Sequence, residues 1–383
     1  MKRIPLAWLQ LTREKRRFFA AISGIAFAVA LMLIQLGFED ALLSSVALVQ
    51  SHLSGDLVLI NPQYQFILAP KTFTERRLYQ TLGVDGVESV EPVYVGQASF
   101  KNLANRTERQ IFMMGFNPRS AVLNAPGVAG NLEKLRDPET VLIDSIRRPE
   151  FGSMAETVSD EQPAITEANG HRVEIIGSFQ LGTGFGIDGT LVMSDETFLR
   201  VLPFRKRGII DVGLITVKPG ADPERVRTEI MRILPSDVQV LTHDEFVQKE
   251  TTYWTTNTPT GFIFKLGVLM GIFVGSIIVY QILYSDVTDH LPEYATLKAM
   301  GYPDRFLFKI VIQESLILSV FGYLPGVLVS QLAYTASQKA TLLPLKLTVA
   351  RVVVVYFLTV LMCAISAALA MRRLKAADPA EIF

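Results

Sequence analysis

The chain has very little of the chemistry that marks an enzyme or a disulfide-stabilised protein. Its 383 residues include one cysteine, Cys363, so no disulfide or thiolate metal site can form within one chain. The four histidines, His52, His171, His243 and His290, are far apart, and none has a His or Cys ligand three or four residues later. Neither a Gly-x-Ser-x-Gly nucleophile motif nor a Gly-x-x-x-x-Gly-Lys-Ser/Thr phosphate loop occurs. We therefore expect no catalytic or metal site, and no P-loop ATP chemistry, in this chain.

Net charge is also lacking. Lys and Arg together number 37, and Asp and Glu together number 37, so the formal net charge is zero. The basic residues are spread through the chain rather than gathered into one patch. This distribution argues against nucleic acid as a partner.

Long apolar runs are present, and their spacing is the most informative feature of the sequence. A run of about 20 apolar residues can cross the roughly 30 Å hydrocarbon core of a bilayer as a helix. We predict one span followed, after a long insert, by three more: 18–38, 266–284, 310–334 and 352–371. A cleavable signal peptide is the alternative for the first run, although signal peptides have a shorter apolar core of roughly 7–15 residues.

Basic residues at the two ends of the chain predict the orientation of the spans. Residues 1–17 and 372–383 carry clusters of Lys and Arg, so the positive-inside rule places both termini in the cytoplasm. Segment 39–265 is then an extracytoplasmic domain, 285–309 a cytoplasmic loop, and 335–351 a short outer loop.

The large insert is predicted to have an α+β fold. Helices are indicated at 72–82, where Thr72 and Glu75 have capping-box spacing, and at 222–234, where Asp222 suits the N-cap. Because each helix precedes a strand in a similar way, we expect two α+β lobes of related build. The expected strands are short and rich in β-branched residues: 56–61, 87–95, 109–116, 140–145, 173–179, 212–217 and 238–241.

Two stalk helices are predicted where the insert meets the membrane. Residues 39–53 continue the first span with apolar residues at helical spacing, and Thr242 and Glu245 have capping-box spacing that opens a second helix. We expect the threonine-rich stretch 251–260 to bend or break that second helix. An interfacial loop with aromatic side chains in the headgroup region is the alternative.

Small residues recur every four positions in the first two spans. Such stripes allow close helix packing in lipid, either within one chain or across a dimer, and the sequence does not choose between the two. The stripes consist of Ala20, Gly24 and Ala28 in the first span and of Gly267, Gly271 and Gly275 in the second.

The cytoplasmic loop contains a short predicted helix, Glu293–Met300. Gly301 suits its C-terminal cap, and Pro303 lies just beyond. A helix this short is marginal alone, so it needs a surface to pack on. The membrane surface and a cytoplasmic protein are the two alternatives.

The chain resembles the permeases of the FtsX/MacB superfamily in its span layout and in the loop Glu293-Tyr-Ala-Thr-Leu-Lys-Ala-Met-Gly301. Residues 1–17, with Leu6-Ala-Trp8-Leu9 and Lys15-Arg-Arg17, are similar to the cytoplasmic amphipathic helix that precedes the first span in this family. The tail, with Arg372-Arg373 and Asp378-Pro-Ala-Glu381, is similar to the family's end. Segments 56–66 and 181–189 most resemble the DevC family of cyanobacterial exporter permeases.

The resemblance implies a transport subunit that is not itself an enzyme. It implies a homodimer in a cyanobacterial inner membrane, served by a separate DevA-like ABC ATPase that binds ATP and Mg, a DevB-like periplasmic adaptor and a TolC-like outer-membrane tunnel. Glycolipid is the implied cargo, and membrane lipid surrounds the spans. The residues implied in ATPase coupling are Glu293, Tyr294, Leu297, Lys298, Met300 and Gly301.

Two further features are functional candidates. The glycine-rich segment is expected to be a flexible hairpin tip rather than a phosphate loop, because it lies between strands, and it is a candidate adaptor contact: Gly182, Gly184, Gly186, Asp188 and Gly189. Glu314 is an intramembrane carboxyl, which is a functional candidate by default, although a structural role near Lys309 is the alternative.

Two functions from different classes remain open. One is the permease of an efflux machine, and the other is an FtsX-like regulatory permease that conveys ATP-dependent motion to an outer partner without moving cargo. The large size of the insert 39–265 favours export.

Overall fold

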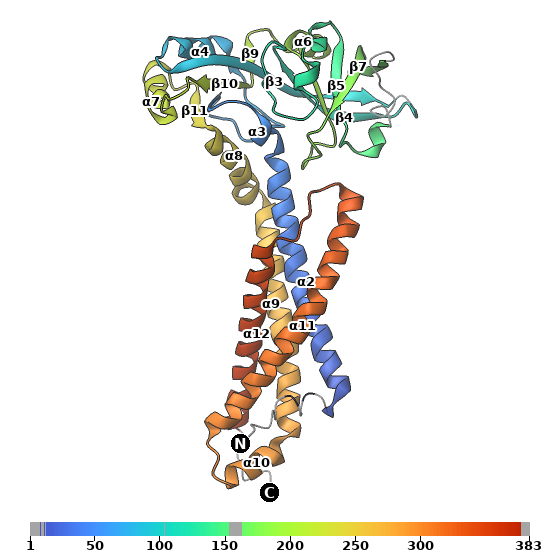
Figure 1. The fold of residues 1–383 in the computed structure, drawn as a ribbon, viewed down its shortest axis with the longest axis vertical. Coiled ribbons are helices and arrows are strands. Elements are labelled where there is room, and N and C mark those ends of the chain that lie inside the picture. The colour runs from blue at the N-terminus through green and yellow to red at the C-terminus, as the bar shows by residue number, and fades with distance from the viewer. Residues whose placement is uncertain (1–7, 9–10, 12, 103, 153–162, 377–383) are drawn as a thin grey trace. The chain divides into compact units, whose positions relative to one another are not determined.

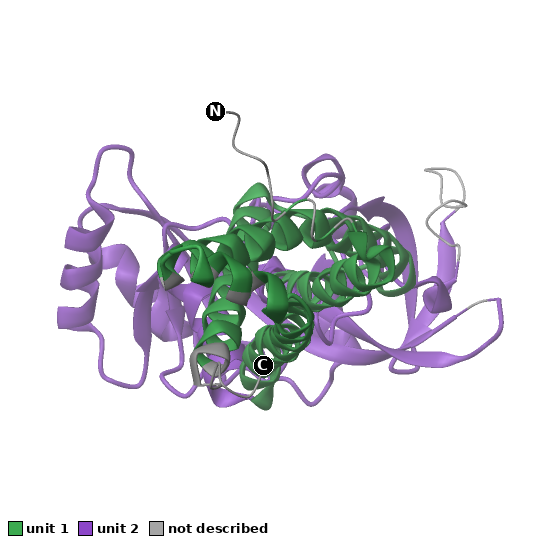
Figure 2. Ribbon diagram, turned by 90° about the horizontal axis from the view of Figure 1, so that it is seen from below, with its two compact units in different colours: residues 1–41, 259–383 green, residues 42–258 purple. Residues whose placement is uncertain are grey.

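The computed structural model describes Trp8, Leu11 and residues 13–102, 104–152 and 163–376. The chain divides into two compact units (Figure 2). One unit comprises Met1–Ala41 with Pro259–Phe383, and the other comprises Leu42–Thr258. Most of residues 1–17 lies outside the described part, as does the tail from 377 onward. The predictions of an amphipathic N-terminal helix and a family-like tail therefore concern largely undescribed residues.

Four long helices make up most of the described part of the first unit, and each contains one of the predicted apolar runs (Figure 1). All four are long and apolar enough to cross a membrane. Each extends beyond its apolar run because helical pairing continues into polar residues at both ends. Their bounds, with those of one short helix, are α2 Lys15–Val46, α9 Pro259–Asp289, α10 Leu291–Ala299, α11 Asp304–Thr341 and α12 Val349–Ala376.

The second unit is built on a nine-stranded sheet with the order β11-β1-β10-β3-β4-β8-β5-β7-β6. Its pairings are antiparallel except for β4 with β8 and β5 with β7. The strands are β1 Leu57–Ile60, β3 Val87–Lys101, β4 Glu108–Phe116, β5 Thr140–Asp144, β6 Ala164–Ala168, β7 His171–Phe179, β8 Thr190–Ser194, β10 Val212–Val217 and β11 Gln239–Thr242. A separate two-stranded sheet pairs β2 Phe73–Thr74 with β9 Ile209–Ile210.

The prediction of two related lobes is wrong, because one strand runs through both halves of the sheet. β3 pairs with β10 through its first half and with β4 through its second half. Alternate residues of β1 enter different cores: Leu57 and Leu59 lie in one apolar cluster, and Val58 and Ile60 in another. Both faces of the sheet are therefore covered, and the domain is one layered α+β body.

The predicted helices of this unit are present, with a difference at one N-terminus, and the helix α6 was not predicted. The expected capping box at Thr72 does not form, because Phe73 and Thr74 pair as a strand with β9 and the helix starts at Glu75. The capping box of Thr242 and Glu245 does form. The bounds are α3 Leu48–His52, α4 Glu75–Gln80, α6 Asp195–Val201, α7 Pro223–Ile233, α8 His243–Thr252, the π-helix η5 Tyr253–Asn257, and the short 3-10 turns η1 Thr81–Gly83, η2 Ala129–Asn131, η3 Lys134–Arg136 and η4 Pro149–Phe151.

The two helices predicted as a stalk contact one another inside this unit. Val49 of α3 and Phe246 of α8 lie in the same buried cluster. The predicted break in the second helix is found as the π-helix η5 at Tyr253–Asn257, where the backbone is wider than in an α-helix. Thr258, in extended conformation, ends it before α9 begins.

Candidate coupling site

The cytoplasmic-loop helix is present as α10, Leu291–Ala299, which begins two residues earlier and ends one residue earlier than the predicted Glu293–Met300. Its C-terminus has the predicted glycine cap, since Gly301 has a φ of 92°. The amide of Tyr302 donates to the carbonyl of Leu297 at 3.1 Å, which is the pairing of a Schellman motif. Pro303 then opens α11. The turn between α10 and α11 is therefore tightly specified by three consecutive residues.

The exposed side of α10 carries the side chains that a protein partner can reach. Glu293 and Thr296 are exposed, and Met300, just beyond the helix, is 63% exposed. Leu297 is half-buried and packs against the apolar core of the helix bundle. Leu297 thus holds α10 on the bundle, whereas Glu293 and Met300 face outward. The side chains of Tyr294 and Lys298 lie outside the described part.

Arginines from the start of the chain pair with both ends of the α9–α10 connection. Arg13 lies 3.9 Å from the carboxylate of Glu293. Arg17 pairs with Asp289, the last residue of α9. All four side chains are more than 40% exposed, so each pair contributes little stability by itself. Together they link residues near the start of the chain to both ends of the α9–α10 connection.

Inside the helix bundle, close to α10, a buried polar cluster joins α9 to α11. Nδ1 of His290 is 2.9 Å from the carbonyl oxygen of Asp286 and 3.7 Å from its carboxylate. Glu314 of α11 is fully buried, and its carboxyl interacts directly with that of Asp286. Glu314 was predicted from its position in an apolar run. Asp286 was missed as its partner because it lies just after the second run, where charged residues are common.

The predicted stripe of small residues on α9 packs within the chain. A Cβ on Gly267 would meet Gln35 at 2.5 Å, one on Gly271 would meet Met32 at 2.9 Å, and one on Gly275 would meet Ala28 at 2.7 Å. On α2, Gly24 faces Ile278 and Ala28 faces Gly275, whereas Ala20 is exposed and lines an open groove.

A second glycine stripe, on α11, was not predicted. A Cβ on Gly322 would meet Ile25 at 2.5 Å, and one on Gly326 would meet Val29 at 2.7 Å. Their spacing of four residues is visible in the sequence.

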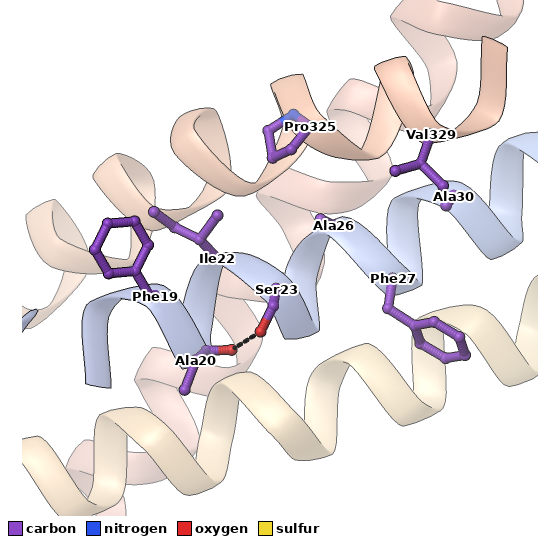
Figure 3. Close-up of a pocket in the computed structure, with 9 residues that line it drawn as sticks. All are labelled: Phe19, Ala20, Ile22, Ser23, Ala26, Phe27, Ala30, Pro325 and Val329. Atoms are coloured by element: carbon purple, nitrogen blue, oxygen red, sulfur yellow. Dashed lines mark hydrogen bonds between the residues drawn. The ribbon is translucent and has the colours of Figure 1, made fainter. Parts of the chain in front are cut away.

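An open apolar groove runs along the surface of α2 beside α11 (Figure 3). Its volume is about 700 Å³. Small side chains form its floor, and the phenyl rings of Phe19 and Phe27 flank it. The lining residues are Phe19, Ala20, Ile22, Ser23, Ala26, Phe27, Ala30, Pro325 and Val329.

The glycine-rich segment contains a tight turn closed by Gly184 and Ile187, but it is not the tip of a strand hairpin, because the strands on either side of it do not pair with each other. β7 pairs with β5 and β6, whereas β8 pairs with β4 and β5. The buried carboxylate of Asp144 accepts bonds from the amides of Leu181 and Gly182. Burial raises the pKa of Asp144, and these amide bonds oppose that rise.

Close packing further restrains the same loop. A Cβ on Gly184 would lie 2.6 Å from the carbonyl oxygen of Ser45, and one on Gly189 would lie 3.3 Å from Phe151. Gly182 and Gly186 have φ of 112° and 79°, which favour glycine. Asp188 pairs with Arg148 at 2.6 Å. The loop is therefore a braced crossover rather than a flexible tip.

A buried carboxyl in α8 was not predicted. Glu250 is 1% exposed and accepts bonds from the Tyr64 hydroxyl at 3.0 Å, the Ile67 amide at 3.1 Å and the Trp254 indole at 3.3 Å. Burial raises its pKa to about 7, and the hydrogen bonds oppose this rise. No sequence signal distinguishes Glu250, because its neighbours are the ordinary polar residues of a solvent-facing helix.

No group of three or more His, Cys, Asp or Glu residues in the described part of the chain could hold a metal ion. The polar clusters described above serve to hold helices and loops together.

Comparison with known proteins adds a family assignment. Residues 18–233 match the MacB-like periplasmic core domain family, and residues 265–379 match the FtsX-like permease C-terminal family. The solved extracellular domain of the noncanonic ABC-type transporter YknZ from Gram-positive bacteria is 18% identical, with a TM-score of 0.35, over 49% of this chain and 99% of that one. The periplasmic region of MacB from Actinobacillus actinomycetemcomitans is 9% identical, with a TM-score of 0.37, over 52% of this chain and 94% of that one. No curated protein matches the chain.

Proposed function

The chain belongs to the MacB-like periplasmic core domain family and carries an FtsX-like permease C-terminal region, and from this we propose that it is the permease subunit of an ATP-driven tripartite efflux system. The family is one of ABC transporter permeases. The proposed cargo is a lipid-like molecule, and the resemblance to DevC favours a glycolipid.

The observation that carries this proposal is the form of α10. A nine-residue helix with a glycine cap is held on the bundle by Leu297, while Glu293 and Met300 face outward. Such a short helix gains its stability from packing, so it moves with the bundle to which it is fixed. A partner that pushes on Met300 therefore pushes on α9 and α11 together.

The partners are proposed from the family and from the sequence. A separate DevA-like ATPase would supply ATP and Mg, because this chain has no phosphate loop. We propose a homodimer in the inner membrane of a cyanobacterium, with both termini in the cytoplasm. A DevB-like adaptor and a TolC-like tunnel would complete the path outward from the domain 42–258.

The test is co-purification of the full chain with its cognate ATPase. Met300→Asp places a charge on the outward surface without disturbing the packing of Leu297, and Glu293→Lys reverses a charge on the exposed side of α10. Both variants are expected to lose the ATPase while still inserting in the membrane. Leu297→Asp should also lose it, through displacement of α10. Lys346→Glu, an exposed charge reversal outside this loop, is the matched control and should bind normally.

Retention of the ATPase by both Met300→Asp and Glu293→Lys would refute the coupling role of α10. Cargo is tested separately by reconstitution with ATPase and adaptor, followed by mass spectrometry of the released material. ATPase binding without any released lipid would favour the regulatory permease instead.

A further inference from the structure

Glu314 has no donor for either of its carboxylate oxygens. The residue is fully buried, and neither Oε1 nor Oε2 has a hydrogen-bond partner among the described residues. Its neighbour Ser315 bonds instead to the carbonyl of Ile312, at 2.9 Å. The direct partner of Glu314 is a second carboxyl, that of Asp286, whose Oδ2 also lacks a donor.

The charged groups around this pair do not neutralise both carboxyls. Nδ1 of His290 lies 3.7 Å from the carboxylate of Asp286. It interacts with Asp286 and not with Glu314. Arg17 influences Asp286 from α2, but its guanidinium already pairs with Asp289 and with Glu14, and Glu14 opposes its effect. Glu314 has no cationic partner in the described part of the chain.

Two adjacent carboxylates without donors are strongly unfavourable in an apolar bundle. Burial disfavours each charge, and the like charges repel one another at short range. A charge within a membrane span is costly unless it is solvated or paired. One proton held between the two groups removes the repulsion and the burial cost of one charge, and the protonated carboxyl becomes the donor that the other lacks.

We propose that Asp286 and Glu314 form a proton-sharing pair that joins α9 to α11 inside the bundle, close to α10. The carboxyl of Glu314 carries the proton and donates a hydrogen bond to the carboxylate of Asp286. His290, one turn further along, then holds the Asp286 carbonyl at the point where α9 passes into α10. The proton-sharing pair does not depend on the proposed function; only its consequence for ATPase coupling rests on that function.

The proton-sharing pair has a mechanical consequence for α10. Asp286 is three residues from the end of α9, and Glu314 is ten residues into α11. The bond therefore closes the frame formed by α9, α10 and α11 at its open end. Loss of the proton would replace this bond with repulsion and loosen the support of α10.

The test is infrared spectroscopy of the full chain in lipid nanodiscs, at a pH above the value of about 7 at which Glu250 ionises. The wild-type-minus-Glu314→Gln difference spectrum is expected to contain the carbonyl band of one protonated carboxyl. Ser315→Ala removes a buried polar neighbour outside the pair and is expected to keep the band. Absence of the band from the wild-type protein, or its survival in Glu314→Gln, would overturn the proposal.

A cation in place of the proton is the alternative occupant, and the same spectra exclude or reveal it. Spectra recorded in sodium and in choline salts are expected to be identical. A band that disappears when sodium is added would mean that the pair binds a cation, and the proton-sharing proposal would fail.

Thermal unfolding supplies a second readout that does not require the ATPase. Glu314→Gln is expected to melt close to the wild-type temperature at neutral pH, because its amide donates to Asp286 as the proton does. Glu314→Ala is expected to melt lower. In alkali the wild-type melting temperature should fall further than that of Glu314→Gln; equal falls in both would contradict the pair. Thermal unfolding tests the proton-sharing pair, and ATPase co-purification tests the coupling function. Failure of one can therefore be distinguished from failure of the other.

Discussion

The buried carboxyl of Glu250 makes the domain 42–258 sensitive to pH between 4.5 and about 7. Burial raises its pKa from 4.5 to about 7, against the hydrogen bonds from Tyr64, Ile67 and Trp254. The folded state therefore binds this proton more tightly than the unfolded state does. The resulting stability is fully present below pH 4.5 and is lost as the pH rises through about 7.

The size of the effect follows from the two pKa values. The difference between 4.5 and about 7 corresponds to about 3 kcal/mol of unfolding free energy lost by Glu250 alone. Since the side chain is 1% exposed, solvent does not screen this contribution appreciably. Glu250→Gln keeps an acceptor for Ile67 and Trp254, and the Tyr64 hydroxyl can accept from the new amide. The variant should therefore lack this pH dependence and be more stable than wild type above pH 7.

Trp254 provides the assay, because its indole donates directly to Glu250 at 3.3 Å. The chain has two tryptophans, so a Trp8→Phe background leaves Trp254 as the sole reporter. Its fluorescence is expected to titrate with a midpoint near 7, and Glu250→Gln is expected to abolish that transition. Denaturant unfolding followed at the same wavelength gives the stability difference. A fluorescence midpoint near 4.5, or an unchanged transition in Glu250→Gln, would refute the reasoning.

Two further predictions concern packing and buried charge. Gly275→Leu is expected to destabilise the bundle by about 1–3 kcal/mol, because its side chain would collide with Ala28 and Met362; thermal unfolding measures this, and Gly301→Asn, at a site with free space and a positive φ, serves as control. Asp211→Ala is expected to cost about 3–5 kcal/mol, since it leaves the largely buried Arg205, now 2.6 Å from the Asp211 carboxylate, without its partner. Chemical denaturation checks the second, and a loss below about 1 kcal/mol would show that the pair is solvated.

The sequence predicts the features that depend on local pattern. Apolar runs of sufficient length determined the four long helices, and the Thr242–Glu245 spacing determined the N-terminus of α8. The Gly301 cap was found for the same reason, because only a few residue types suit a positive φ. These signals lie within a few residues of one another.

Features that depend on residues far apart in the chain could not be predicted from the sequence. β8 was missed because its partners β4 and β5 lie far away in the chain, and the single sheet was missed because β3 continues beyond the apolar segment ending at Val95. The same reason hid Glu250, whose bonds come from Tyr64 and Ile67 nearly 190 residues earlier. A carboxyl's burial depends on its partners, and no local pattern records it.

The two glycine stripes determine where a homodimer can form. The α9 stripe contacts one face of α2 through Ala28 and Met32, and the α11 stripe contacts another face through Ile25 and Val29. Both stripes are therefore occupied within a single chain, so the proposed homodimer must use a different surface. It follows that Gly275→Leu should lower the stability of the bundle even in a monomeric preparation. A variant that dissociated dimers but left monomer stability unchanged would contradict this assignment of the stripe.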